Sequence, residues 1–168
     1  MENLKTIKTT LTLFIENGKI LLGEKKRGFA KGTLNGIGGK QDPGETIEEA
    51  MIRECEEEIG AKPLLYSKVG RINFDLWYKG EHANMEMHIY KCTQYSGTIR
   101  ETEEIIPNWY DLNNPPFARM LEDDLLWLPQ VLQGKSIIGK VNFSKDMKML
   151  YHNFKVVENI NKNDIKML

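Results

Sequence analysis

The chain has few of the residues on which several classes of protein depend. Its 168 residues include only two cysteines, Cys55 and Cys92, which excludes the disulfide framework of small secreted proteins. The three histidines, His82, His88 and His152, show no metal-ligand spacing, and no Ser-His-Asp or Cys-His set is indicated. There is no run of about 18 apolar residues, the length that a transmembrane helix needs. Residues 1–10 lack the apolar core of a signal peptide. We therefore expect a reduced, cytoplasmic protein with no membrane partner.

The chain also lacks an excess of charge of either sign. Its formal net charge is −1, so no overall field attracts it to nucleic acid, and we expect no duplex partner. Its hydrophobic content of 40% is ordinary for a globular protein. The length suits one domain, which we place at residues 1–157, with a C-terminal tail at 158–168 that is either frayed or a short helix. We expect a monomer, with a dimer as the alternative.

Most of the regular secondary structure that the sequence predicts is β-strand. Residues 11–15 alternate in polarity and precede Asn17-Gly18, which predicts a hairpin with a return strand at 19–22. We predict further strands at 65–78, 85–93, 105–112, 137–143 and 150–157, and helices at 47–59 and 123–133. Residues 27–46 are rich in glycine and predict a long loop, where functional residues often lie. The fold class expected is α/β (α+β), with a mixed sheet sandwiched between helices as α/β/α layers.

The helix expected at 47–59 carries acidic residues where a purely structural helix would not. Thr46 and Glu49 form a T-x-x-E capping box that marks its start. At about 100° per residue, the apolar residues gather in one sector of this helix. Glu49 and Glu56 lie away from that sector, as solvated residues do. Three other carboxylates lie at its edge, and their i, i+3, i+4 spacing places them on one patch: Glu54, Glu57 and Glu58.

Such a patch needs a cation. Three like charges at a partly buried edge repel each other and lose hydration, which is unfavourable unless a positive charge compensates them. Oxygen ligands are hard donors that select Mg²⁺, Mn²⁺ or Ca²⁺ and disfavour zinc. We expect Mg²⁺ at the patch, with Mn²⁺ as an alternative. A merely solvated acidic face would instead concentrate its charge near Glu49 and Glu56.

The loop before this helix is suited to a phosphate-bearing ligand. Gly38 and Gly39 permit close approach of a ligand or metal to the backbone. Lys40 can counter the charge of a phosphate. Because phosphates and the helix are both anionic, a bridging metal is needed before the two can approach each other.

From Gly39 onward the residues match a known signature. The chain reads GKQDPGETIEEAMIRECEEEIGA, which fits the Nudix box Gx5Ex7REUxEExGU at every fixed position. The chain therefore resembles the Nudix hydrolases. Three further segments are similar to the MutT-type and mammalian-type oxidised purine nucleoside triphosphatases: KKRGF (25–29), LNGIGGK (34–40) and LEDD (121–124). This similarity extends over about residues 5–157.

The resemblance implies a reaction and a set of metal ligands. The reaction is Mg²⁺-dependent cleavage of a nucleoside triphosphate such as 8-oxo-dGTP to monophosphate and pyrophosphate, in nucleotide-pool sanitation and DNA repair. The implied ligands are Glu54, Glu57, Glu58, the carbonyl of Gly38, and Glu104. Glu103 competes with Glu104 for the last role, which is to ligate a metal or to orient the attacking water. Arg53 and Glu45 would form an ion pair that orients the loop and helix.

The resemblance also implies a nucleotide pocket. Lys25 would meet phosphate, Asn35 would hydrogen-bond the base, and Thr10 and Phe29 would line the nucleoside site. Asp123 and Asp124 would recognise the polar edge of the base, because a carboxylate can accept from the ring N–H and the exocyclic amine of guanine together. Without the resemblance, the two aspartates fit the N-terminus of a helix equally well.

Two positions depart from the mammalian enzymes, which carry tryptophan where this chain has Leu34 and Leu121. Leucine provides apolar area but no π-face, so stacking on the base is expected to weaken by roughly 1 kcal/mol. Phe29 and Phe74 remain as stacking partners. The tryptophans of the chain are predicted to pack in the core: Trp77, Trp109 and Trp127.

Two alternative functions remain open from the sequence. One is hydrolysis of another Nudix substrate, such as a nucleotide sugar, a dinucleoside polyphosphate or isopentenyl diphosphate. The other is a non-catalytic module that binds nucleotides or RNA ends. The complete set of box glutamates argues against the second, because a module without catalysis has no need of metal ligands.

Overall fold

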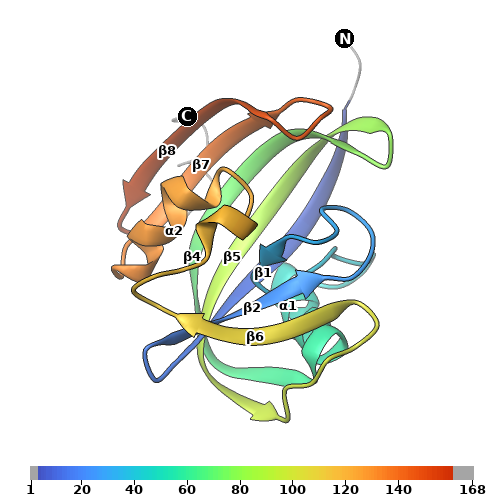
Figure 1. Cartoon of the computed structure of the whole chain (residues 1–168). Helices are drawn as coiled ribbons and strands as arrows, with labels where there is room; N and C mark the ends of the chain where they lie inside the picture. The colour runs from blue at the N-terminus through green and yellow to red at the C-terminus, as the bar shows by residue number, and fades with distance from the viewer. Residues whose placement is uncertain (1–3, 161–168) are drawn as a thin grey trace.

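The computed structural model of the protein describes residues 4–160, which form a mixed sheet with helices packed on it (Figure 1). The strands run in the order β3-β2-β1-β5-β4-β7-β8, and β6 pairs with β2. The β1–β5 and β4–β7 pairs are parallel, and the other pairs are antiparallel. The strands are β1 (Lys5–Glu16), β2 (Lys19–Lys25), β3 (Leu34–Asn35), β4 (Ala61–Tyr78), β5 (Glu81–Gly97), β6 (Ile105–Asp111), β7 (Ser136–Phe143) and β8 (Met149–Val157).

The two α-helices, α1 (Ile47–Ile59) and α2 (Asp124–Leu132), pack on different faces of this sheet. Alternate residues of β1 show the division, because Leu13 packs with residues of α2 and Phe14 packs with residues of α1. Figure 1 shows α1 beside β1 and β2, and α2 beside β7. A short 3₁₀ helix, η1 (Phe117–Arg119), precedes α2. The expected α/β/α layering is confirmed.

The ends of α1 follow from its sequence. The capping box between Thr46 and Glu49 is present in both directions, and Gly60 ends the helix with a left-handed φ of 76°. The residues of α1 that are buried are Ala50, Met51, Cys55 and Ile59, which confirms the predicted apolar sector apart from partly exposed Ile47.

The glycine loop is held against β1 rather than free in solvent. β1 pairs with β2 only near its end, and the loop takes the remaining edge of β1. The Thr10 N–H donates to the Gly39 carbonyl at 2.9 Å, and the Thr12 N–H donates to Ile37 at 2.6 Å. The N–H of Gln41 donates to Lys8 at 2.9 Å, which continues the pairing toward α1. This pairing places the loop between the central strand and the acidic helix.

Several sequence predictions are corrected or extended by the structure. Trp127 is 1% exposed in the core and Trp109 is partly buried against it, but Trp77 belongs to neither core cluster. Alternation along β4 turns Trp77 to the face opposite Phe74, where it stacks on His82 with ring centroids 5.3 Å apart.

The tail predicted at 158–168 lies largely outside the described residues. Within residues 4–160, neither α-helix has the length and apolar character needed to span a membrane. Both cysteines are buried and free.

Candidate active site

A cleft of about 880 Å³ opens where the glycine loop, α1, the tip of the β4–β5 hairpin and the start of α2 meet. The structure brings fifteen of the predicted site residues to its wall, whereas Arg53, Glu45 and Leu34 do not line it. The fifteen are Thr10, Lys25, Phe29, Asn35, Gly38, Gly39, Lys40, Glu54, Glu57, Glu58, Phe74, Glu104, Leu121, Asp123 and Asp124.

The helix α1 supplies the acidic part of the cleft. The Glu54 side chain is 13% exposed and the Glu57 side chain is 60% exposed. Burial, followed by the charge of Glu54, raises the pKa of Glu58 to about 7. Burial also raises the pKa of Glu54, although Arg53 opposes this shift. Burial therefore disfavours the ionised forms of Glu54 and Glu58.

Steric crowding requires glycine at two positions beside these acids. A Cβ added at Gly38 would collide with the Thr10 carbonyl oxygen, and one added at Gly39 would collide with the Glu54 carboxylate. Only glycine therefore lets the loop pass between β1 and α1 at this point. The close approach leaves backbone groups of the loop beside the carboxylates.

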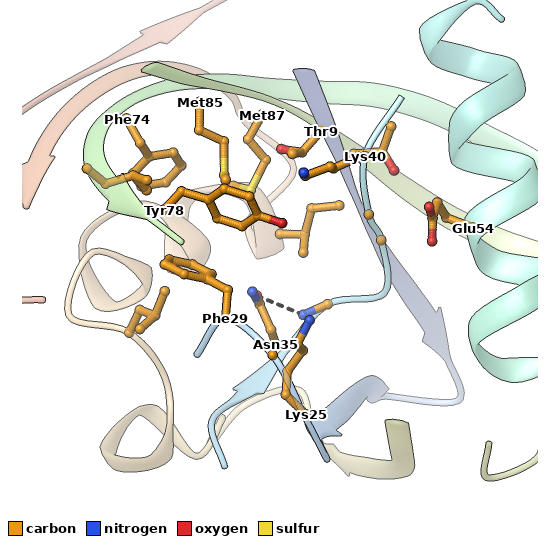
Figure 2. Close-up of a pocket in the computed structure, with 18 of the residues that line it drawn as sticks. Thr9, Lys25, Phe29, Asn35, Lys40, Glu54, Phe74, Tyr78, Met85 and Met87 are labelled. Carbon is orange, nitrogen blue, oxygen red and sulfur yellow. Dashed lines mark hydrogen bonds between the residues drawn. The ribbon is translucent and has the colours of Figure 1, made fainter. Parts of the chain in front are cut away.

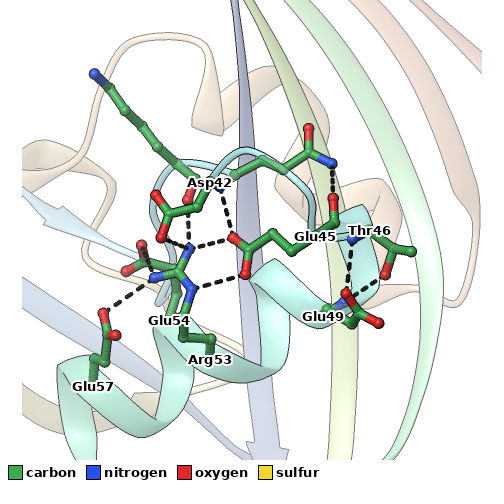
Figure 3. A network of polar contacts seen from close by, with 9 residues as sticks. Asp42, Glu45, Thr46, Glu49, Arg53, Glu54 and Glu57 are labelled. Atoms are coloured by element: carbon green, nitrogen blue, oxygen red, sulfur yellow. Dashed lines mark hydrogen bonds and ion pairs between the residues drawn. The ribbon is translucent and has the colours of Figure 1, made fainter.

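Arg53 lies behind the cleft and ties the loop to the helix (Figure 3). Its guanidinium donates to Glu45 twice, at 3.0 and 2.5 Å, and to the Lys40 carbonyl at 2.9 Å. It also donates to Glu54 at 3.0 Å and to Glu57 at 3.2 Å. Arg53 lowers the pKa of Glu45 to about 2, and a backbone hydrogen bond from Asp42 contributes. This network suits a residue that positions the loop and the acids.

A second arginine, Arg27, lies in the wall of the cleft beside Glu104. Arg27 forms an ion pair with Glu104, and the Arg27 Nε–H donates to Glu104 at 2.8 Å. This pairing lowers the pKa of Glu104. Glu103 is not part of the cleft wall, and its side chain is 91% exposed. The position of Glu104 therefore favours it over Glu103 as the additional acid.

The acids are suited to a metal ion, although their carboxylates do not yet converge. Within residues 4–160, no three acidic, histidine or cysteine side chains are placed to hold an ion as they stand. Glu54 and Glu57 are turned to Arg53, and Glu104 is turned to Arg27. By contrast, Glu58 Oε2 is buried and accepts no hydrogen bond from the described residues. An all-oxygen set with such an unpaired atom fits a hard divalent cation.

The two aspartates before α2 form the other polar part of the cleft. Asp123 and Asp124 are 1% and 3% exposed. Asp123 Oδ2 accepts from Trp127 Nε1 at 2.9 Å, and Asp124 Oδ2 accepts from the Leu121 N–H at 3.2 Å. Asp123 stands at the N-cap position and Asp124 in the first turn of α2, so both lie at a helix N-terminus as the alternative interpretation expected, although Asp123 makes no side-chain cap hydrogen bond. Its Oδ1 atom is buried without a partner among the described residues.

Burial disfavours the ionised form of both aspartates. It raises the pKa of Asp123 to about 6, and it raises the pKa of Asp124 well above its ordinary value, with the charge of Asp123 adding to the effect. Because the two carboxyl groups are adjacent and interact, their titration belongs to the pair and not to either residue alone. The pair can therefore present both a hydrogen-bond donor and an acceptor to a ligand near neutral pH.

Apolar and aromatic residues complete the wall (Figure 2). Phe74 is stacked on Phe143 within the core, with ring centroids 6.1 Å apart. The Asn35 Oδ1 atom accepts from the Gly36 N–H at 2.9 Å, which orients the amide beside the loop. Leu34, expected in the pocket, is instead fully buried in the core and does not line the cleft, because β3 pairs with β2 and turns it inward.

Sequence reasoning missed several residues of this wall. Arg27 has no place in the Nudix box, and Tyr78, Met85 and Met87 lie on strands far from it. The signal that could have found them is the alternation of β4 and β5. Tyr78 shares the face of Phe74, and the register pairs Phe74 with Met85.

Comparison with known proteins agrees with this geometry. Residues 6–131 match the family described as NUDIX domain. The chain is 40% identical over 151 residues to the oxidized purine nucleoside triphosphate hydrolase of Danio rerio, covering 90% of this chain and 96% of that protein. Identity to the Mus musculus protein of the same name is 39% over 149 residues, covering 89% and 94%. A MutT protein from Bacillus halodurans has the same fold, with a TM-score of 0.79 at 21% identity over 89% of this chain and 97% of that one.

Proposed function

This chain belongs to the Nudix family, and we propose that it hydrolyses oxidised purine nucleoside triphosphates such as 8-oxo-dGTP to the monophosphate and pyrophosphate. The observation that carries the proposal is that one cleft contains two buried carboxylate oxygens that have no hydrogen-bond partner among the described residues. Glu58 Oε2 comes from the acidic helix and Asp123 Oδ1 from the start of α2. A metal ion that also binds the phosphate chain would satisfy the first, and a hydrogen-bond donor on a base would satisfy the second. Such activity removes damaged nucleotides before they enter DNA.

The metal proposed is Mg²⁺, with Mn²⁺ as an alternative. It would be held by Glu54, Glu57 and Glu58, by the Gly38 carbonyl and by Glu104. When bound, it neutralises phosphate oxygens and lowers the pKa of the attacking water. Arg53 donates to one oxygen each of Glu54 and Glu57, and Arg27 donates to one oxygen of Glu104, so the second oxygen of each carboxylate could bind the ion without loss of these contacts. The two arginines would also offset the mutual repulsion of the acids.

The residues of the chain itself hold the substrate and direct the water. Lys25 and Lys40 line the cleft near the acids and would bind the phosphates. Glu104 would accept the proton of the attacking water or orient it, because its ionised form is favoured by Arg27. Arg53 would remain behind the site and position the loop through the Lys40 carbonyl.

The aspartate pair would select the base. An oxidised guanine presents N–H groups and a carbonyl along one edge. With one of Asp123 and Asp124 protonated and the other ionised, the pair would accept from the N–H groups and donate to the carbonyl. Thr10, Phe29 and Asn35 would line the nucleoside, and Leu121 would contribute apolar area. These contacts, and not the metal, would determine which base the enzyme prefers.

We further propose that the enzyme acts as a monomer in the cytoplasm, with neither duplex nucleic acid nor membrane as a partner. The net charge of −1 supports the absence of a nucleic-acid partner. Size-exclusion chromatography with light scattering tests the oligomeric state, and a dimer mass would overturn that part of the proposal.

A substrate panel tests the main proposal. Hydrolysis with Mg²⁺ is followed by chromatography of substrate and products for 8-oxo-dGTP, dGTP, dCTP, a nucleotide sugar, a dinucleoside polyphosphate and isopentenyl diphosphate. We expect kcat/KM to be highest for 8-oxo-dGTP and pyrophosphate to be the second product. A higher value for a nucleotide sugar or a dinucleoside polyphosphate would overturn the substrate class. Nucleotide binding without turnover of any compound would identify a non-catalytic module.

A further inference from the structure

Four aromatic rings line the cleft, but only two of them are free to receive a ligand. Phe74 and Phe143 are 6% and 3% exposed and stack on each other at an interplanar angle of 13°. Phe29 and Tyr78 are partly exposed, and their ring centroids are 5.7 Å apart at an angle of 55°. Because Leu121 has no ring, an aromatic contact with a base must come from Phe29 or Tyr78.

The backbone holds Tyr78 firmly at the mouth of the cleft. It is the last residue of β4, and it pairs with Glu81 across a tight turn. The two turn residues, Lys79 and Gly80, have φ values of 51° and 78°, the left-handed conformations of a two-residue hairpin turn. Alternation along β4 sends the Tyr78 side chain to the face of Phe74. Figure 2 shows its ring between Phe29 and the two methionines of β5, Met85 and Met87.

The ring of Tyr78 also lies beside the cations of the cleft. Lys40 Nζ is 4.3 Å from the ring centroid, and Lys79 Nζ is 5.4 Å from it. Burial alone would raise the pKa of the Tyr78 hydroxyl, but Lys40, Lys79 and Lys25 together lower it. Tyr78 therefore stands where the apolar wall of the cleft meets its positive wall. A ligand that joins a flat ring to an anionic chain fits this junction.

We propose that Tyr78 is a specificity-determining residue that stacks on the purine ring of the substrate. The proposal rests on the proposed function, because it concerns the same cleft. A purine offers a larger π-face than a pyrimidine, so stacking on Tyr78 favours purine nucleotides. When the nucleotide binds, Lys40 can exchange its contact with the ring for a stronger one with phosphate.

Binding measurements on the full chain test this role. Isothermal titration calorimetry is performed with 8-oxo-dGMP, with dCMP and with tripolyphosphate, which has no base. Tyr78→Leu keeps apolar volume but removes the ring, and we expect it to weaken 8-oxo-dGMP about tenfold. Tripolyphosphate is expected to change less than about twofold, because stacking involves no phosphate. Tyr78→Phe keeps the ring and is expected to bind 8-oxo-dGMP with about the affinity of the wild type.

Steady-state kinetics provide a second readout that a purely structural role would not move. Tyr78→Leu is expected to raise KM for 8-oxo-dGTP more than it lowers kcat. The ratio of kcat/KM for dGTP to that for dCTP is expected to fall by about fivefold. Tyr151→Leu is the matched control, because Tyr151 lies on β8 outside the cleft and is 45% exposed. Circular dichroism checks folding, and Tyr78→Met replaces Tyr78→Leu if the latter is unfolded.

Three results would overturn the proposal. They are unchanged affinity of Tyr78→Leu for 8-oxo-dGMP, an equal loss for tripolyphosphate, and a loss in Tyr78→Phe as large as in Tyr78→Leu. The second result would mean that Tyr78 acts by positioning Lys40 for phosphate binding. The third would mean that the Tyr78 hydroxyl, and not the ring, is responsible for the affinity. Failure of the proposed function is separate. It would appear as wild-type protein that binds 8-oxo-dGMP through Tyr78 but does not hydrolyse 8-oxo-dGTP.

Discussion

The acidic side and the nucleoside side of the cleft are built in different ways. The acidic side comes mainly from one continuous segment, residues 38–58, in which a glycine loop passes directly into α1. The nucleoside side is assembled from β3, the β4–β5 hairpin and the start of α2, which are far apart in the chain. Both sides contain buried carboxylates. On the acidic side, Arg53 and Arg27 form ion pairs with the glutamates. On the nucleoside side, no arginine or lysine among the described residues is paired with Asp123 or Asp124. The first side is thus suited to a cation and the second to a neutral hydrogen-bonding base.

This difference predicts that changes on the two sides have different kinetic effects. Loss of an acidic residue on α1 should reduce kcat, because the metal acts on the reacting phosphate. Changes near α2 should act on KM and on base selectivity, because they alter binding remote from the reaction.

The largest effect is expected for Glu58→Gln. It removes a charge from the metal site, so kcat should fall by about 100- to 1,000-fold. The same change removes a buried negative charge that repels Glu54, so the melting temperature should stay the same or rise. Assays at saturating Mg²⁺ and differential scanning calorimetry measure both quantities. Glu56→Gln is the control, because Glu56 lies on the exposed face of α1. Near-normal turnover of Glu58→Gln would remove the basis for the metal assignment.

Arg53→Ala is expected to reduce kcat/KM by about 10- to 100-fold without contacting the substrate. The Lys40 carbonyl of the loop would lose its hydrogen bond from Arg53. Glu45 and Glu54 would lose the cation with which both form ion pairs. The apparent Mg²⁺ affinity, measured by activity titration, should fall as well. Arg119→Ala serves as the control, since Arg119 pairs with Glu24 at 3.0 Å on the surface. An unchanged Mg²⁺ titration would show that Arg53 does not position the acids.

Asp123→Asn should change the pH dependence of stability. The pKa of Asp123 is raised to about 6 in the folded protein, so the folded state binds the proton more strongly than the unfolded state. The unfolding free energy of the wild type should therefore lose a contribution as pH rises from about 4 to about 6. The variant lacks this loss, so its stability relative to wild type should increase over that window by on the order of 2 kcal/mol.

Urea unfolding at several pH values between 4 and 7 measures this difference. Asp111→Asn is the control at an exposed aspartate. If the difference between variant and wild type does not vary with pH, the burial of Asp123 does not govern its ionisation.

Leu121→Trp is expected to have the smallest effect. A tryptophan would add a π-face to the nucleoside side and lower KM for 8-oxo-dGTP by about fivefold, with kcat little changed. Leu125→Trp is the control, because Leu125 follows in the same segment and is 57% exposed. An increase in KM for Leu121→Trp would mean that the cleft, with Tyr78 already in place, has no room for a second large ring.

The acidic side was readable from the sequence because its geometry is local. Helix periodicity alone places Glu54, Glu57 and Glu58 on one patch, and the capping box and Gly60 set both ends of α1. The strand pattern likewise predicted the hairpins of the sheet. Trp77 and Leu34 show the limit of such reasoning. A tryptophan or leucine in a strand reads as buried and apolar, but which face it occupies depends on the elements that cover that face.

What the sequence by itself determined is therefore the grouping of the acidic residues on one patch of α1 and the family to which the chain belongs. Hydrogen bonds and side-chain contacts between neighbouring turns of a helix depend only on residues a few positions apart. The tertiary structure alone placed Tyr78 and Arg27, which the sequence did not indicate, in one cleft with the residues that the resemblance assigned to the substrate. Tyr78, Arg27 and Asp123 reach one cleft only because the pairing of β4 with β5 and β7, and the packing of α2 on the sheet, bring distant segments together. No local pattern encodes that convergence, since it depends on contacts between residues far apart in the chain.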